Sequence, residues 1–353
     1  MGLGGNITEI NMSNHIIDDA VYVYKLECGR DPYMARAGYE FIKALKPNIK
    51  KRVVMKPNIT ITADRDSGIV THPDFIAGMV DYFNEIRLSP EDIMIAEGGG
   101  NDAMEEYYGL GGYTEMCQQH CSTLVNLNHD ESIVYHLPDS EFFKEISIAK
   151  TVTDKDNYFI NVPKMKTHNL AVTTLCMKNL MGTLTPPHKR HLCSFPQELG
   201  NRHNEISPNG IELREEVLCK RLSDLSTVLK PDLNVIEGIV GRDGTAFRHG
   251  KNIQTNLVIG GKNTTMVDAV ASYLMGFEPS GIGYLKIANM CGLGVIDIEK
   301  IDIYEVVDET IKPCEDLSQY MSKIPFEVLA WDKHARDIPL NNEMLARNQT
   351  VTV

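Results

Sequence analysis

Two lysines and a histidine follow the most strand-like stretch of this 353-residue sequence. The run Tyr158–Val162 is apolar, aromatic and β-branched, as is typical of a buried strand, and Pro163 then removes a hydrogen-bond donor. The chain is therefore expected to leave the sheet at Pro163, just before Lys164, Lys166 and His168. Lysine and histidine side chains bind anions and transfer protons, so this strand exit is the first candidate for a reactive site.

The residues after His168 have the spacing of a helix. Leucine, threonine and methionine side chains recur every three or four residues from Asn169 to Met181, and Gly182 with Pro186–Pro187 supplies a stop. Lys178 follows His168 by close to three helical turns, so both side chains are expected on one side of this helix. A buried lysine there is a candidate base, nucleophile or covalent anchor.

Other strand-like runs also end in polar or glycine-rich loops. Arg52–Met55 and Asp92–Ala96 are two such runs, and a third begins at Leu233. The residues of interest after these runs are Lys56, Asn58, His72, Glu97, Gly98, Gly99, Gly100, Glu237, Arg242 and Asp243. The carboxyl ends of parallel strands meet at one edge of a sheet, where ligands bind. The cluster predicted at this edge consists of Lys56, Glu97, Lys164 and Glu237.

The candidate residues divide into three predicted roles. The predicted catalytic residues, which transfer protons or bind covalently, are His168, Lys178, His72 and Lys164. The predicted substrate-binding residues are Lys56, Asn58, Lys166, Asn179, Arg242, Gly98, Gly99 and Gly100. The candidate ligands of a divalent metal ion are His168, His188, His191, Glu237 and Asp243. Because the histidines lack a spacing such as H-x-x-x-H, a metal site would have to be assembled from distant loops.

Each of these residues also has a purely structural interpretation. A single lysine or histidine at a strand exit is more often solvated than reactive, and His188–His191 is compatible with an exposed basic turn. The Gly98–Gly100 run completes neither a Walker motif nor a dinucleotide-binding motif, and glycines serve tight turns. Asp268, on a helix predicted from Thr264 to Met275, is either a functional acid or a charge near the helix dipole.

Composition limits the classes of partner. The net charge of −13 argues against nucleic acid and against an anionic membrane surface, because both are bound through excess Lys and Arg. No run approaches about eighteen apolar residues, so no membrane span is predicted. The eight cysteines form no C-x-x-C pair, which favours a reduced, cytoplasmic protein. A Lys and His cluster in this acidic chain is a candidate pocket for a small anionic molecule, and a homo-oligomer is compatible with the sequence.

Strand-like runs alternate with helical stretches along most of the chain. This order predicts an α/β fold with a mainly parallel sheet covered by helices, built from Rossmann-like units in two lobes. Residues 1–50 are predicted to form an N-terminal extension with a first helix, and 51–310 the α/β core, with an excursion at 183–210. Residues 311–353 are predicted to be an irregular tail. The polar part of the excursion, 191–209, has two prolines and no apolar period, which favours a lid.

The central stretch NVPKMKTHNLAVTTLCMKNLMG resembles the family called domain of unknown function 362. Further matching pieces include KPN at 56–58, THP at 71–73, AEGGG at 96–100 and LNVIEGIVGRDG at 233–244. With the helix TTMVDAVASYLMGF, the resemblance spans roughly residues 50–305 and implies no settled reaction. Many members carry a cysteine-rich, ferredoxin-like module that this chain lacks, so the resemblance implies no iron–sulfur cluster here.

A more distant likeness concerns His168 and Lys178. A strand, a histidine and then a lysine-bearing helix are similar to the nickel-pincer lactate racemases, in which the lysine holds a pyridinium-derived cofactor. This likeness implies that Lys178 is a covalent anchor and His168 a metal ligand or acid/base group. The stretch NLAVTTLCMKN departs from the racemases, which have a glycine-rich approach to the lysine.

Two functions follow from the sequence. The first is an enzyme for a small anionic metabolite, a carboxylate or phosphate, with isomerase or lyase chemistry, because no nucleophile motif such as G-x-S-x-G is present. The alternative is a non-catalytic protein that binds an anion or a metal cofactor in the same pocket. Either way, several clustered cations repel one another, so at least one lysine is predicted to have a lowered pKa.

Overall fold

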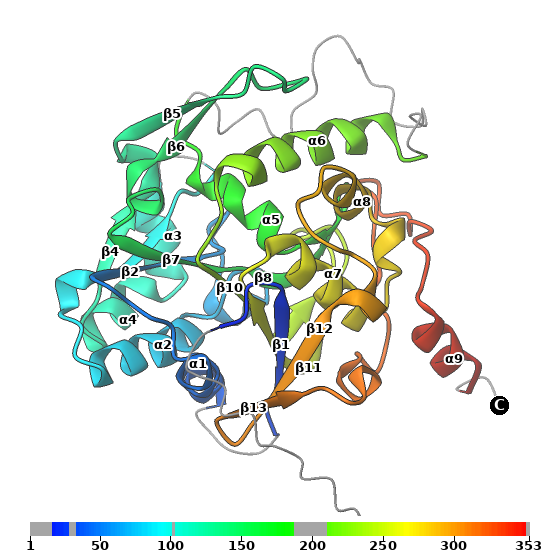
Figure 1. Cartoon of the computed structure of the whole chain (residues 1–353), viewed down its shortest axis with the longest axis horizontal. Helices are drawn as coiled ribbons and strands as arrows, with labels where there is room; N and C mark the ends of the chain where they lie inside the picture. Colours follow the sequence, from blue (N-terminus) through cyan, green and yellow to red (C-terminus); the bar gives the residue numbers. More distant parts are fainter. Residues whose placement is uncertain (1–15, 28–32, 101–102, 187–209, 351–353) are drawn as a thin grey trace, which may run out of the picture.

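One large sheet runs through the chain. The computed structural model describes residues 16–27, 33–100, 103–186 and 210–350. Among them, eleven strands form a mixed, mostly parallel sheet in which nine follow the order β13-β12-β1-β11-β10-β7-β2-β3-β4, with β8 and β9 beside β10 (Figure 1). These strands are β1 (Ala20–Lys25), β2 (Arg52–Pro57), β3 (Ile93–Glu97), β4 (Thr123–Asn126), β7 (Asn157–Val162), β8 (Lys164–His168), β9 (Val172–Thr174), β10 (Leu233–Arg242), β11 (Asn252–Gly261), β12 (Asp302–Val307) and β13 (Thr310–Pro313). The predicted α/β class is confirmed.

Helices cover both faces of the sheet (Figure 1). The helices of the described residues are α1 (Tyr33–Leu45), α2 (Pro73–Glu85), α3 (Met104–Leu110), α4 (Tyr113–Gln119), α5 (Cys176–Asn179), α6 (Leu213–Val228), α7 (Thr264–Leu274), α8 (Gly283–Met290) and α9 (Asn342–Thr350). Val53 and Met55 of β2 pack in the same cluster as α1–α4, whereas Val54 packs with Leu225 of α6. Successive strand side chains point to opposite faces, so an uninterrupted apolar run such as this one fits a strand buried on both sides.

Pro163 does not take the chain out of the sheet, contrary to the prediction. Residues Lys164–His168 form β8, which pairs in parallel with β10, with Lys164 opposite Glu237. Proline removes only its own donor, and the Pro163 carbonyl still accepts a hydrogen bond of 2.9 Å from the Glu237 amide. The chain therefore shifts its pairing at Pro163 and continues alongside β10.

The helix predicted from Asn169 to Met181 is also wrong. Val172–Thr174 forms β9, antiparallel to β8, and only Cys176–Asn179 forms an α-helix, α5, followed by a 3-10 turn at Leu180–Thr183. β-branched side chains favour extended structure, and Val-Thr-Thr supplies three in a row. The spacing of the apolar residues was compatible with both structures over so short a stretch.

Two further regions complete the described part of the fold. Residues 132–149 form a separate two-stranded sheet of β5 (Ser132–His136) and β6 (Glu145–Ala149). The tail predicted to be irregular contains β13, which pairs with β12, and helix α9. The predicted lid, 191–209, and the two histidines His188 and His191 lie outside the described residues.

Candidate functional site

Two buried lysine–glutamate ion pairs lie where parallel strands end. Lys56 Nζ, at the end of β2, is 2.8 Å from Glu97 Oε1, at the end of β3. Lys164 Nζ, at the start of β8, is 2.5 Å from Glu237 Oε2 in β10. Each of the four side chains is at most 2% exposed. The predicted grouping of these residues at the carboxyl edge is confirmed.

Backbone amides complete both ion pairs. Each carboxylate accepts two further hydrogen bonds, of 2.8–3.3 Å, and the donors are the amides of Ile59, Gly98, His72 and Ile239. Burial lowers the pKa of Lys56, while the charge of Glu97 opposes that shift. The charges of both pairs are thus satisfied within the protein, which suits a structural role for Lys56 and Lys164 in joining the strand ends. The substrate-binding role predicted for Lys56 and the catalytic role predicted for Lys164 stay predictions.

The glycines beside the Lys56–Glu97 pair serve close packing and turns. A Cβ at Gly182 would lie 2.1 Å from Glu97 Oε1, so Gly182, predicted only as a helix stop, is required by this close approach. The amides of Gly98, Gly99 and Gly100 donate to Glu97 Oε1, Met104 Sδ and the Thr60 carbonyl. All three donors are thus engaged inside the protein, although the same glycines line a cavity of about 300 Å³.

Strand β8 presents three basic side chains on one face. Lys164, Lys166 and His168 alternate with Met165 and Thr167, and Met165 is buried in the hydrophobic core. In a strand, alternate side chains share a face, so the K-x-K-x-H spacing places the three basic groups on the same side. This alternation was not predicted, because Pro163 indicated a loop for these residues.

Lys166 is buried and differs from an ordinary lysine in its protonation. Its Nζ donates to Asn58 Oδ1 and to the Ile69 carbonyl, both at 2.6 Å. Burial, together with the charges of Lys164, Lys178 and Arg242, lowers the pKa of Lys166 to about 7. The predicted lowered lysine pKa is therefore found, at Lys166. A neutral amine still supplies the two hydrogens for these bonds and keeps a lone pair free.

A cavity of about 850 Å³, which we call the cationic cavity, opens beside β8. Its charged and aromatic lining comprises Lys166, His168, Lys178, Glu212, Arg214, Phe247, Trp331, Asp332 and Arg336. Lys178, Arg214 and Arg336, together with Lys166, thus outnumber the two carboxylates in a chain whose net charge is −13. A concave site with an excess of positive charge focuses the field and favours an anion.

His168 enters the cationic cavity as a neutral side chain. Its Nδ1 accepts hydrogen bonds from the Leu170 amide, at 3.0 Å, and the Ala171 amide, at 3.1 Å. Burial and the charges of Lys178 and Lys166 hold the pKa of His168 well below its ordinary value. With Nδ1 engaged as acceptor, the proton of the neutral ring is assigned to Nε2. In this arrangement His168 is placed as a hydrogen-bond donor through Nε2, and the acid/base and metal-ligand roles predicted for it stay predictions.

Lys178 reaches the same cavity through the short helix α5. The amides of Cys176 and Met177, at the start of α5, donate to Asp268 at 2.7 and 3.0 Å. Asp268 therefore caps α5, not the helix α7 on which it lies. Next to Lys178, Asn179 bonds Lys56 Nζ at 3.1 Å and so serves the ion pair. Lys178 and His168 do share one site, as predicted, but a strand hairpin and α5 bring them together.

Replacing Asp268 with asparagine is expected to lower the free energy of unfolding by about 1–3 kcal/mol, because an amide group cannot accept both α5 hydrogen bonds. Burial raises the pKa of Asp268 to about 6, from 3.8 for an ordinary aspartate. Between these two values the folded state binds more protons than the unfolded state, so the free energy of unfolding rises as the pH falls. The difference between wild type and Asp268→Asn should widen from pH 7 to pH 4, by up to about 3 kcal/mol. Urea unfolding across this range checks it, with the half-exposed cap Asp297→Asn as control; a constant difference would contradict the raised pKa.

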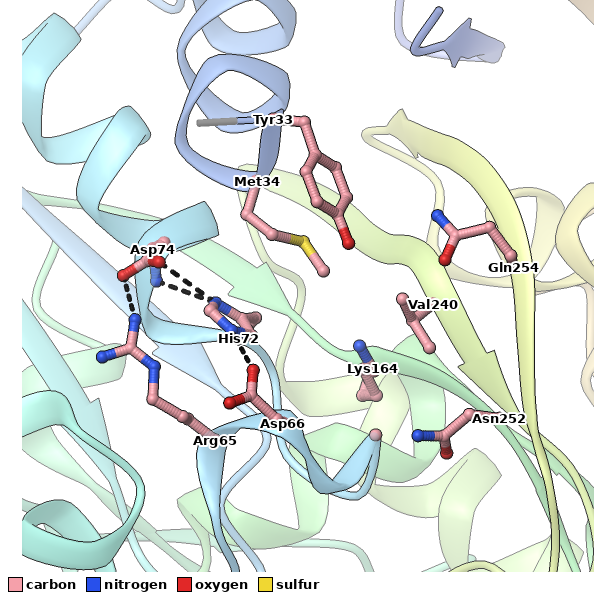
Figure 2. Close-up of a pocket in the computed structure, with 11 residues that line it drawn as sticks. Tyr33, Met34, Arg65, Asp66, His72, Asp74, Lys164, Val240, Asn252 and Gln254 are labelled. Atoms are coloured by element: carbon pink, nitrogen blue, oxygen red, sulfur yellow. Dashed lines mark hydrogen bonds and ion pairs between the residues drawn. The ribbon is translucent and has the colours of Figure 1, made fainter. Parts of the chain in front are cut away.

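His72 and Lys164 line a different cavity, of about 560 Å³. Figure 2 shows His72 between Asp74 and Asp66, with Lys164 on the opposite side of the cavity. His72 Nδ1 accepts the Asp74 amide at 3.2 Å as the N-cap of α2, and His72 Nε2 lies 3.2 Å from Asp66 Oδ1. Both ring nitrogens of His72 are thus engaged. The four predicted catalytic residues are divided between two cavities, and only His168 and Lys178 lie in the cationic one.

Comparison with known proteins covers most of the strands and helices that carry these residues. Residues 53–273 match the family described as Domain of unknown function (DUF362). The chain belongs to this family. It is 22% identical over 252 residues to the "Thylakoid-associated protein sll1697" of Synechocystis sp., covering 69% of this chain and 68% of that protein.

A solved structure offers a weaker likeness. A Thermotoga maritima protein crystal structure is 11% identical, with a TM-score of 0.37, over 59% of this chain. The match spans half of the length of that solved chain. Within the described residues of the DUF362 protein, no helix combines the length and apolar character needed to cross a bilayer.

Of the candidate metal ligands of the DUF362 protein, His168, Glu237 and Asp243 lie within the described residues and are not grouped as a metal site there. Across the described residues, no three His, Cys, Asp or Glu side chains are grouped so as to hold a metal ion. Glu237 is paired with Lys164, and Asp243 Oδ1 accepts the Lys251 amide at 2.6 Å, which closes the β10–β11 turn. Arg242 donates to Asn252 Oδ1 at 2.9 Å, and its predicted role in binding substrate stays a prediction.

Sequence reasoning missed several residues of the cationic cavity. Arg214 lies on α6, and Arg336 and Trp331 lie in the tail that was predicted to be irregular. Arg336 donates to the Asn169 and Leu170 carbonyls at 3.0 and 2.8 Å and pairs with buried Glu215 at 2.8 Å. No local pattern in the sequence connects these residues to β8.

Proposed function

We propose that this DUF362 protein is an enzyme that binds an anionic metabolite, a carboxylate or phosphate, in the cationic cavity. The chemistry would be of the isomerase or lyase type, with proton transfer next to the anionic group. The observation that carries the proposal is Lys166, a buried amine of lowered pKa that lines a cavity shared with Lys178, Arg214 and Arg336. Perturbed titratable groups in a cleft are typical of active sites.

Each group has a role that suits its surroundings. Lys166, neutral in a substantial fraction of molecules near pH 7, would accept the proton from carbon. Lys178, Arg214 and Arg336 would neutralise the anionic group, which lowers the cost of forming a carbanion beside it. The neutral His168 would donate from Nε2 to the oxygen on which charge develops.

A second function is favoured by one observation. His168 and Arg336 are fixed by hydrogen bonds to backbone groups, which suits a rigid site that holds a ligand without reacting with it. The protein would then bind an anion or an anionic metal cofactor without turnover. Both functions require the same anion site, and only the first requires proton transfer by Lys166.

Exchange of carbon-bound hydrogen distinguishes the two functions. In D₂O, the wild-type protein should exchange the hydrogen next to the anionic group of at least one compound in a panel of small carboxylates and phosphate esters. Lys166→Met should slow this exchange by about 10²–10⁴-fold, the usual contribution of a general base. Proton NMR checks the result, and Lys155→Met, at an exposed lysine, serves as the control. Anion binding without exchange on any compound would support the non-catalytic function.

We also propose that the protein acts in the cytoplasm. The chain's net charge of −13 disfavours an anionic membrane surface, and its cysteines show no disulfide pattern. The Synechocystis relative is described as thylakoid-associated, and membrane association is therefore the competing location. Cell fractionation decides between them, because recovery in the membrane pellet at high salt would contradict a cytoplasmic location.

A further inference from the structure

The cationic cavity is larger than a small anion requires. Its volume is about 850 Å³, within the ~300–1,000 Å³ range of sites that hold drug-sized molecules. The lining is also partly apolar, since Ile61, Ile69 and Leu170 contribute to it. A phosphate or acetate ion at the lysines and arginines would leave this apolar part unfilled.

Two aromatic side chains form part of the wall. Trp331 and Phe247 meet edge to face, with ring centroids 6.3 Å apart and planes at 71°. The Arg248 guanidinium lies over the indole ring, 4.7 Å from its centroid. Even so, Trp331 is 53% exposed. The chain's only tryptophan thus lines the cavity while about half of its surface is uncovered by the protein.

The segment that carries Trp331 is fixed to the cationic part of the site. The Ala330 amide donates to the His334 carbonyl at 2.8 Å across a tight turn. The Leu329 amide donates to the Gly244 carbonyl at 3.2 Å. Thr167 of β8 donates to the same Gly244 carbonyl at 3.0 Å. The indole and the basic face of β8 are therefore held in one framework, which suits a single ligand that contacts both.

We propose that the ligand is an aromatic anion, with its ring against Trp331 and Phe247 and its carboxylate or phosphate among Lys166, Lys178, Arg214 and Arg336. This inference rests on the proposed anion site and specifies the class of substrate. Aromatic rings prefer edge-to-face or offset contacts with one another, and such contacts add to the gain from burying apolar area. A ring of the ligand would complete the aromatic wall that Phe247 begins.

Matched pairs of ligands test the inference. Methyl phosphate and phenyl phosphate share one anionic group, as do acetate and phenylacetate, so only the ring differs within each pair. Binding to the wild-type protein is followed by calorimetry and by the fluorescence of Trp331. The phenyl compound of at least one pair should bind about tenfold more tightly and change the fluorescence. Trp331→Leu should bind the methyl compounds as before and lose the phenyl preference, whereas Trp331→Phe should retain most of it.

Each outcome separates the inference from the proposed function. If the methyl and phenyl compounds bind equally well, the aromatic subsite is overturned and the anion site remains. If the phenyl preference survives in Trp331→Leu, the ring binds elsewhere and the inference is likewise overturned. If none of the four compounds binds, both the anion site and the aromatic subsite are contradicted.

Discussion

Replacing Glu97 with glutamine should lower the free energy of unfolding by roughly 3–5 kcal/mol, because it leaves Lys56 buried without its counter-charge. The same change also weakens the hydrogen bond that Glu97 accepts from the Ile59 amide. Urea unfolding at pH 7 measures the loss. The matched control is Glu131→Gln, because the Lys150–Glu131 pair has similar geometry at 2.7 Å but is solvent-exposed. That control should cost less than about 1 kcal/mol.

The double variant Lys56→Met with Glu97→Leu separates two contributions to this loss, the missing counter-charge and the cost of burying a charge. Removing both charges removes the cost of burying them, so the double variant should be more stable than Glu97→Gln. If Glu97→Gln costs no more than Glu131→Gln, the buried pair does not hold the strand ends together as inferred. Turnover and ligand binding are separate questions, since neither Lys56 nor Glu97 lines the cationic cavity.

Lys166 should make the stability of the protein strongly dependent on pH. Its folded-state pKa of about 7, against 10.5 for an ordinary lysine, means that the folded state binds fewer protons than the unfolded state between these values. Stability should therefore fall as the pH falls from about 10 to 7. The contribution of Lys166 to this loss is about 4 kcal/mol. Below pH 7 it should change little further.

Comparison with Lys166→Met isolates this contribution. Lys56 also has a lowered pKa and acts in the same direction, but it is present in both proteins. The variant should gain stability relative to wild type as the pH is lowered from 10 to 7, whereas Lys155→Met should show no such trend. Urea midpoints at four pH values measure the difference. Parallel curves for wild type and Lys166→Met would contradict the lowered pKa of Lys166.

The sequence was most informative where the physical cause is local. Apolar runs such as Tyr158–Val162 predicted buried strands, and the parallel-sheet rule placed Lys56, Glu97, Lys164 and Glu237 at one edge. The predictions were wrong between Pro163 and Met181, where a hairpin of β8 and β9 and a short helix replace the predicted loop and helix. The alternation in K-x-K-x-H indicates β8, whereas Pro163 indicates the end of a strand, and the two signals conflict.

The rest of the cationic cavity depends on contacts between distant parts of the chain. Arg336 is held by carbonyls of Asn169 and Leu170, more than 160 residues away in sequence, and no spacing encodes that contact. Asp268 likewise caps α5 from another helix, although its own helix suggested a local role. The tautomer of His168 could not be predicted from the sequence either. It depends on the two backbone amides that donate to Nδ1, and the type of residue does not reveal these partners.

The thermal stability of the protein in the presence of anions tests the central claim most directly, namely that Lys178 and its cationic neighbours form an anion site. Phosphate, sulfate or a dicarboxylate should raise the melting temperature of the wild-type protein, because binding to the folded state stabilises it. Lys178→Met keeps an apolar stem but removes the charge, and should abolish most of this rise with little effect on the protein without ligand. Lys155→Met, at an exposed site, should leave it unchanged. An anion-dependent rise that is equal in wild type and Lys178→Met, or absent from wild type, would contradict the claim.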